Sequence, residues 1–316
     1  MDIVEQVSVG FAQHTDRPMS AIDAALYYVV SRLQQQQLSG HLEEEVITSS
    51  LMGSMSSTFP LSIALFGTGE PQNTECYWAQ YRKAKPTGVS QKDFEAVSGA
   101  DFALVLRLGD DLCRVALFQG KKGEVSRLPG GKINLHRRCD PPKGNIDDPT
   151  WRPAQMVALR DAGVAIMDAI DPGVVHTIEH LCWIHYLGYF DKLARAIQMA
   201  DLGGHLAREE TNKTFRINAV ELRATDPVFL HVLLAGLGSD KDAARYWLPM
   251  TWKQACDHLP ALRNLTELYL ADESRGSGSI DMQAQPDSVI TQVALSRPNG
   301  YDPVDAPGAP GRKMGN

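Results

Sequence analysis

The sequence has 316 residues, of which 43% are hydrophobic and 22% charged, and it carries a formal net charge of −7. A chain of this length can bury one large core or two small ones, and the composition is that of an ordinary globular protein. The acidic balance excludes a basic field over the whole molecule, so any contact with nucleic acid must depend on a local patch.

Cysteine usage and hydropathy narrow the class of protein further. The five cysteines lie far apart and form neither a CxxC pair nor a Cys–His cluster with zinc spacing. An odd, scattered set of thiols suits a reducing compartment. The sequence has no run of about 18 apolar residues, and its first residues lack the pattern of a secretory signal. We therefore expect a soluble, cytoplasmic protein without a membrane segment.

The N-terminal third alternates helical and turn-rich stretches. Apolar residues at helical spacing predict one long helix over residues 1–38 and a second over residues 41–55. The second helix opens on the acidic run 43–45 (EEE), and carboxylates in a first turn are favoured by the helix dipole. Residues 66–93 are polar and rich in turn formers, which predicts an insertion or a long loop. Within it, the stretch 77–83 (YWAQYRK) is expected to form a short helix that packs on the protein or, alternatively, stacks on bases.

The clearest pattern is a β-hairpin within residues 94–123. The apolar runs 102–108 and 112–118 flank the turn 109–111 (GDD), and Gly-Asp between branched apolar runs is a good hairpin signal. The hairpin brings the residue before its first strand, Asp101, beside the end of its second strand.

Three polar side chains are expected to meet at this end of the hairpin. Gln119 and Lys121 follow the second apolar run and are two residues apart, so they point to the same face of the strand. A carboxylate from Asp101, a carbonyl acceptor and an ammonium would then converge at one sheet edge. This set suits a divalent-metal phosphodiesterase, because Mg²⁺ prefers carboxylate and carbonyl oxygens and a neighbouring lysine can hold the attacking water or the phosphate. The glutamates at the start of helix 41–55 would complete the oxygen ligands.

The C-terminal half gives weaker patterns. We predict a helix over residues 152–170, a buried strand in the second half of 174–187, and a helix over residues 243–270 that is broken near its two prolines. Residues 217–237 mix a short strand-like stretch with an apolar run. From residue 272 the composition shifts to Gly, Ser, Pro and Asp, which predicts a flexible tail over residues 272–316.

The order of these features resembles the PD-(D/E)xK restriction-endonuclease-like superfamily. An acidic helix start is followed by Gly-Ala-Asp at a strand start and by Gln-x-Lys at the end of the next strand, as in Mrr-like and other small bacterial nucleases associated with phage defence. The resemblance matches Asp101 to the motif aspartate, Gln119 to the (D/E) position and Lys121 to the lysine. Glu44 or Glu45 matches the glutamate of the first helix.

The resemblance covers residues 41–190 and departs from the family pattern at Ala100, where a proline usually precedes the aspartate. It implies an α/β fold with a restriction-endonuclease-like core, in which helices flank a mixed central sheet, and with additional C-terminal helices. The expected organisation is a nuclease-like core over residues 1–190, a helical or mixed extension over residues 191–271 packed on that core, and the flexible tail.

The resemblance also implies an activity, namely an endonuclease that depends on Mg²⁺ or Mn²⁺ and cleaves DNA as a phage-defence effector, with RNA as an alternative substrate. Asp101, Gln119 and the helix glutamates would hold the ion, and Lys121 would position the attacking water. A homodimer and a defence-system partner protein are further expected partners. The predicted nucleic-acid contacts are the basic residues in and after the hairpin: Lys121, Lys122, Arg127, Lys132, Arg137 and Arg138.

Two other interpretations stay open. The glutamine in place of an acidic ligand and the acidic net charge favour a non-catalytic subunit that binds nucleic acid or protein on the same fold. The hairpin could also be only the core of an unrelated α/β protein. Gln155 matches a family position but is more readily a surface residue of its helix. His176, His180 and His185 have a spacing that fits packing in the core better than metal ligation.

Overall fold

The secondary structure is that of an α/β protein, as predicted. The computed structural model describes residues 2–35, 42–66, 74–81, 99–109, 111–124, 131–137, 154–190, 193–211, 217–258, 265–272 and 276–280. The helices are α1 (Ile3–Ala12), α2 (Ala21–Gln35), α3 (Glu44–Phe66), α5 (Gln155–Ile170), α6 (Gly203–Thr211), α7 (Phe229–Gly236), α8 (Asp240–Ala243) and α9 (Trp252–His258), with the 3-10 turns η4 (Ile178–His180) and η5 (Met199–Leu202). The strands are β1 (Thr74–Tyr81), β2 (Phe102–Leu108), β3 (Leu112–Glu124), β4 (Lys132–Asn134), β5 (Ile184–Phe190), β6 (Leu193–Gln198), β7 (Ala219–Glu221), β8 (Leu248–Thr251), β9 (Leu265–Asp272) and β10 (Gly276–Ile280).

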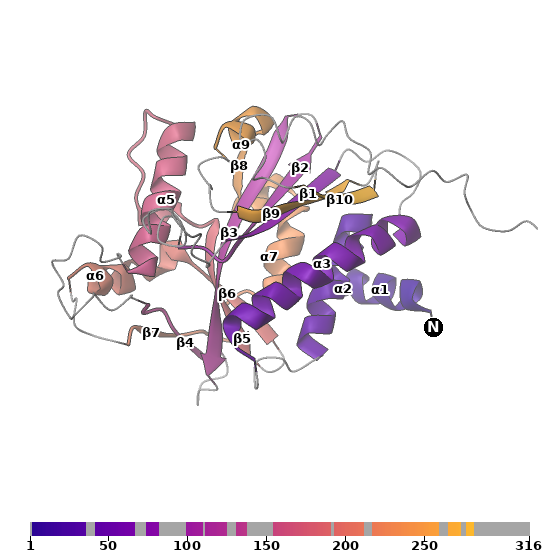
Figure 1. Cartoon of the computed structure of the whole chain (residues 1–316), viewed down its shortest axis with the longest axis horizontal. Coiled ribbons are helices and arrows are strands. Elements are labelled where there is room, and N and C mark those ends of the chain that lie inside the picture. The colour runs from indigo at the N-terminus through magenta and orange to yellow at the C-terminus, as the bar shows by residue number, and fades with distance from the viewer. Residues whose placement is uncertain are drawn as a thin grey trace, which may run out of the picture.

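A mixed sheet runs through the described part of the chain, and β3 is its central strand (Figure 1). β2 pairs with one edge of β3 in antiparallel and matches Phe102 with Phe118. On the other edge β8 pairs antiparallel and β5 parallel, and β5 places Tyr186 opposite Gln119. β1, β9 and β10 continue the sheet beyond β2, and β6 continues it beyond β5. β4 and β7 extend from the last residues of β3.

The predicted hairpin is the β2–β3 pair. β2 spans Phe102–Leu108 as predicted, whereas β3 begins at Leu112 and continues to Glu124, past the predicted end at residue 118. Gly109 supports the turn with a φ of +89°, a backbone conformation that L side chains rarely adopt. β3 is longer than predicted because β5 pairs with its second half, so Gln119 and Lys121 lie inside the sheet.

Helices cover both faces of the sheet, and the alternation of side chains along the hairpin separates two cores. Val105, Val115 and Leu117 belong to the core that is closed by α5 and α6, which lie together on one side of the sheet (Figure 1). Leu104 and Ala116 belong to the opposite core, which is closed by α2, α3 and α7.

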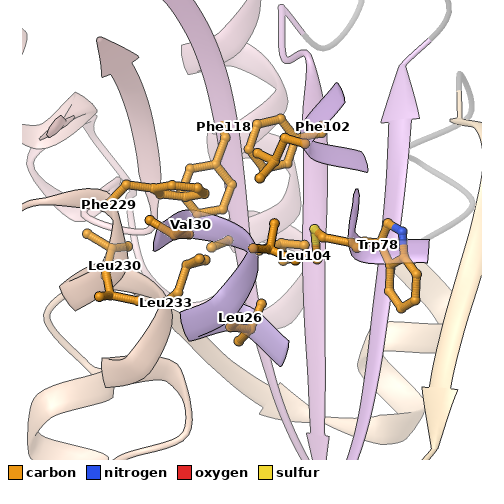
Figure 2. Packing of buried hydrophobic residues seen from close by; sticks show 14 of the residues in the cluster. Leu26, Val30, Trp78, Phe102, Leu104, Phe118, Phe229, Leu230 and Leu233 are labelled. Carbon is orange, nitrogen blue, oxygen red and sulfur yellow. The ribbon is translucent and has the colours of Figure 1, made fainter. Parts of the chain in front are cut away.

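Aromatic packing dominates the second core. Figure 2 shows the rings of Phe102 and Phe118 close to Phe229 of α7, with Leu26 and Val30 of α2 nearby. The ring centroids of Phe102 and Phe118 are 4.8 Å apart and nearly parallel. Burial of each such side chain stabilises the fold by roughly 1.5–3 kcal/mol, so this cluster fixes the hairpin against the N-terminal helices.

Two predictions for the N-terminal third were wrong. The single helix expected over residues 1–38 is two helices, α1 and α2. The segment 66–93 is not a loop with a short helix at 77–83, because Thr74–Tyr81 forms β1, an inner strand between β2 and β9. Tyr77 packs in the first core and Trp78 in the second, so β1 is apolar on both faces. A strand that is buried on both faces lacks the polar alternation by which strands are recognised in a sequence.

The C-terminal part also differs from its prediction. The helix expected over residues 243–270 is replaced by β8, α9 and β9. Pro249 is tolerated in β8 because this strand pairs only with β3 among the described residues, which leaves the other edge open. β10 occupies the start of the tail that was expected to be flexible, and residues 281–316 lie outside the described residues. The predicted extension 191–271 supplies β6, β8 and β9 to the same sheet.

Among the described residues, no helix is both long enough and apolar enough to cross a membrane.

His185 gives the core an acid-sensitive element. Its imidazole is buried, stacks on Phe118 and donates from Nε2 to the carbonyl of Tyr246 at 2.9 Å, and burial lowers its pKa from 6.5 to about 4. Between pH 6.5 and pH 4 the unfolded chain therefore binds more protons at His185 than the folded chain does. The contribution of neutral His185 to the free energy of unfolding is complete above pH 6.5 and is lost as the pH falls to 4. We expect a loss of about 3 kcal/mol over this window.

Urea unfolding at several pH values checks this prediction. His185→Phe, which keeps a planar ring but cannot be protonated, should be less stable than the wild type at pH 7, because it lacks the bond to the Tyr246 carbonyl. Its stability should fall less towards pH 4, so the difference between the two proteins should shrink or reverse. An identical acid limb in both proteins would contradict the assignment to His185.

Candidate functional site

Asp101 is held at the start of β2 by the backbone around it. Its amide donates to the carbonyl of Phe118 at 2.9 Å, which continues the β2–β3 pairing by one residue. Gly99, two residues earlier, has a φ of +64°, and a Cβ there would lie 2.5 Å from the carbonyl oxygen of Gln155. Only glycine fits this approach of the chain to α5. Asp101 is consequently buried where the hairpin meets the first turn of α5.

The carboxylate of Asp101 contacts the Gln-x-Lys stretch directly. Its Oδ2 accepts from Gln119 Nε2 at 2.7 Å and from the backbone amide of Gly120 at 2.8 Å. Gln119 Nε2 also donates to the Gly120 carbonyl at 3.0 Å, so the amide nitrogen lies between two oxygens. Gln119 Oε1 is buried and accepts no hydrogen bond from the described residues. The predicted convergence of Asp101 and Gln119 is therefore present in the structure.

Lys121 lies inside the protein rather than on its surface. The residue is 5% exposed, and its Nζ donates to Gln155 Oε1, at the start of α5, at 2.8 Å. The same Nζ is 3.6 Å from Glu44 Oε1, at the start of α3. A buried ammonium requires such partners, because leaving water without them costs several kcal/mol. Gln155, which was expected as a surface residue, is 8% exposed and contacts the site.

Glu44, rather than Glu45, faces the hairpin. The Glu44 side chain is 19% exposed and accepts from the Lys122 backbone amide at 3.4 Å, whereas the Glu45 side chain is 51% exposed. Arg137 contacts both carboxylates, with Nη1 at 3.2 Å from Glu44 Oε1 and Nη2 at 3.8 Å from Glu45 Oε1. Glu44 is thus the glutamate that adjoins Lys121, and Arg137 contacts the same carboxylate.

Two tyrosines and a threonine that the sequence did not indicate line the same region. A Cβ at Gly120 would lie 3.1 Å from both Asp101 Oδ2 and Thr48 Oγ1, so the strand can approach α3 only because glycine stands there. Thr48 Oγ1 is 3.0 Å from Tyr189 Oη. Burial, together with the nearby Asp101 carboxylate, raises the pKa values of Tyr186 and Tyr189, so both phenols stay neutral. The Tyr186 hydroxyl has no hydrogen-bond partner among the described residues.

The predicted basic patch is largely paired where it is described. Lys121 is buried, Arg137 is bound to Glu44 and Glu45, and Lys132 is 4.0 Å from Glu124. Lys122 is exposed. Arg127 and Arg138 lie outside the described residues. Acidic neighbours therefore offset the charge of three of the four described members, Lys121, Lys132 and Arg137.

The three histidines do not form one cluster. His176 and His180 adjoin each other at η4, where His180 is exposed and helps to cap the turn, so only His185 fits the expected packing in the core. Among the described residues, no group of three or more His, Cys, Asp or Glu side chains could hold a metal ion. A hard cation bound at Asp101 would thus need amide or backbone oxygens as its further protein ligands.

The site joins parts of the chain that are far apart in sequence. The hairpin supplies Asp101, Gln119 and Lys121, while α3 supplies Glu44 and α5 supplies Gln155. Comparisons with protein-family models, with curated proteins and with solved structures find no match for this chain. The function is therefore inferred from the chemistry of these residues.

Proposed function

We propose that the chain is a metal-dependent endonuclease that hydrolyses phosphodiester bonds of DNA, with RNA as an alternative substrate. The observation that carries the proposal is the contact of buried Lys121 with both Glu44 and Gln155, beside the Asp101–Gln119 hydrogen bond. A buried cation next to a carboxylate–amide pair, at the end of a central strand, suits the handling of a phosphate and a water molecule. A mixed sheet with helices on both faces agrees with the restriction-endonuclease-like core that the resemblance implies.

The donor atoms at this point fit Mg²⁺ or Mn²⁺. Asp101 Oδ2 and the Gly120 carbonyl both accept from Gln119 Nε2, so two hard oxygens converge on one position. The two ends of a side-chain amide differ little in size, and exchanging them would present Gln119 Oε1 to the same position. That oxygen is buried and accepts no hydrogen bond from the described residues. A buried oxygen of this kind is one that a bound ion could satisfy. Asp101, Gln119 and the Gly120 carbonyl would hold the ion.

A divalent ion in this place would supply a water molecule of lowered pKa and would offset the charge that develops on the phosphate. The protein supplies orientation. Gln155 and Glu44 hold the Lys121 ammonium beside this position, where it would act as a point charge toward the attacking water or a phosphate oxygen. Glu44 faces the ammonium from α3, with Oε1 3.6 Å from Nζ.

Cleavage assays on the full-length protein test the proposal. Supercoiled plasmid, linear duplex and single-stranded RNA are incubated with the protein in Mg²⁺, in Mn²⁺ and in EDTA. We expect cleavage that requires the metal and falls at least about 100-fold in Asp101→Asn. Asp168→Asn, at an exposed position of α5, is the matched control and should cleave like the wild type. Intact substrates in every metal condition would refute the proposal.

A non-catalytic accessory subunit on the same fold is the second candidate. It is favoured by the hydrogen bond that the Gln119 amide donates to Asp101 Oδ2 and by the contact of Arg137 with Glu44, since both carboxylates have protein partners. The two candidates differ in metal binding. Calorimetric titration with Mn²⁺ should give binding that is lost in Asp101→Asn if the chain is a nuclease, and no such binding if it is an accessory subunit. The role in phage defence, the homodimer and a defence-system partner belong to the proposal on the strength of the resemblance.

A further inference from the structure

Arg137 is placed on the rim of the candidate site and is the more exposed of its two cations. Its guanidinium is 3.2 Å from Glu44 Oε1 through Nη1 and 3.8 Å from Glu45 Oε1 through Nη2. Its side chain is 38% exposed, whereas that of Lys121 is 6% exposed. Glu44 therefore neutralises two cations at once, one inside the protein and one at its surface.

The backbone beneath Arg137 is fixed even though the tip of the side chain is exposed. Its carbonyl accepts from the amide of Gln155 at 3.1 Å, and the preceding imidazole, His136, lies 3.1 Å from both carboxylate oxygens of buried Glu209. A long side chain on a fixed base can change its partner without any movement of the strands. Lys121 lacks this freedom, because it would have to leave Gln155 inside the protein.

Charge balance indicates which contact changes when a ligand arrives. Lys121 already contacts Glu44, and Arg137 contacts Glu44 and Glu45. A divalent cation beside Asp101 would add two positive charges to this group. The exposed guanidinium is the easier of the two cations to displace, because ion pairs near the surface are weak. A phosphodiester that binds with the cation has two oxygens that can accept hydrogen bonds from the guanidinium. It could therefore replace the Glu44 and Glu45 carboxylates as the partner of Arg137.

We infer that Arg137 is an exchangeable clamp, which occupies Glu44 and Glu45 in the free protein and moves to a backbone phosphate of the nucleic acid in the complex. This inference rests on the proposed function, and it makes Arg137 a residue that regulates metal and nucleic-acid binding at the same site. In the free protein Arg137 offsets the negative charge of Glu44 and so weakens divalent-cation binding at the Asp101 position, and in the complex it contributes one phosphate contact. Substrate binding and metal binding thereby favour each other.

Two measurements on the full-length Arg137→Gln variant test the clamp. Calorimetry with Mn²⁺ alone should give a Kd about five-fold lower than in the wild type, since one competing ion pair is lost. Binding of a short DNA duplex, measured in Ca²⁺ by fluorescence anisotropy, should weaken, and the slope of log K against log salt should fall by about one. Arg208→Gln, at an exposed position of α6, should change neither quantity.

A double-mutant cycle separates the clamp from a general charge effect. In a Glu44→Gln background, Arg137→Gln should no longer tighten Mn²⁺ binding, because the two residues act through the same contact. An unchanged or weaker Mn²⁺ affinity in Arg137→Gln, with wild-type binding that depends on Asp101, would overturn the clamp and leave the nuclease proposal standing. Absence of Mn²⁺ binding in every protein would overturn both.

Discussion

Replacing Lys121 by methionine should lower the rate of nucleic-acid cleavage at least about 100-fold without unfolding the protein. Removal of one preorganised donor from a site that stabilises developing charge typically has an effect of this size. Methionine keeps the length of the buried stem, so packing around this buried side chain should be preserved. The variant leaves Gln155 Oε1 without its bond, while Glu44 retains Arg137.

Stability should therefore change little in Lys121→Met, because the loss of the hydrogen bond to Gln155 and of the ion pair with Glu44 is offset by the removal of a buried charge. Initial cleavage rates in Mg²⁺ and Mn²⁺, measured beside urea unfolding, check both halves of this prediction. Lys241→Met, at an exposed position of α8, controls for the loss of a lysine and should keep full activity. Cleavage by Lys121→Met at the wild-type rate would show that the buried ammonium has no part in the reaction.

Replacing Gln119 by glutamate should make the fold depend on divalent metal. The new carboxylate would put an oxygen where Gln119 Nε2 now stands, 2.7 Å from Asp101 Oδ2 and 3.0 Å from the Gly120 carbonyl. The new carboxylate oxygen, Asp101 Oδ2 and the Gly120 carbonyl would then repel one another, because the N–H donor that now lies between them is gone. This repulsion should destabilise the protein by about 2–4 kcal/mol at pH 8 in EDTA. Mn²⁺ or Mg²⁺ should restore most of this loss, since a cation satisfies all three oxygens.

The same variant has a predictable response to pH. The Asp101 carboxylate raises the pKa of the carboxyl group introduced at position 119 in the folded state, so the destabilisation is present above that pKa. As the pH falls towards about 5, the pair takes up a proton that can bridge the two groups, and the difference from the wild type should diminish. Thermal unfolding with and without Mn²⁺ at pH 5 and pH 8 measures these effects. Gln119→Leu should show no metal response, and an equal metal response in Gln119→Glu and the wild type would contradict the ion position.

Local patterns in the sequence were enough to predict the centre of the molecule. Gly-Asp between two apolar runs predicted the β2–β3 hairpin, and the pairing geometry of a hairpin placed Asp101 beside Gln119. The alternation of side chains then put Lys121 on the same face. These features depend on residues within about one hairpin length, where backbone geometry leaves few alternatives.

Features that depend on distant segments could not be read in the same way. β1 was mistaken for part of a loop and a short helix because Tyr77 and Trp78 face two different cores, so the alternation of polar and apolar residues that marks a strand is missing there. The choice between Glu44 and Glu45 depends on how α3 packs against β3, which no local pattern encodes. The pairing of Arg137 with Glu44 joins residues 93 positions apart, and a basic run in the sequence gives no sign of such an acidic partner.

The wide spacing of the contacts to Lys121 has a consequence during synthesis. The lysine must meet Glu44, encoded 77 residues earlier, and Gln155, encoded 34 residues later. A nascent chain that has emerged from the ribosome only as far as the hairpin holds Asp101, Gln119 and Lys121 but lacks the segment that seats the ammonium. The contacts that seat Lys121 are therefore incomplete until translation has passed the start of α5, and any activity that depends on them would begin only then.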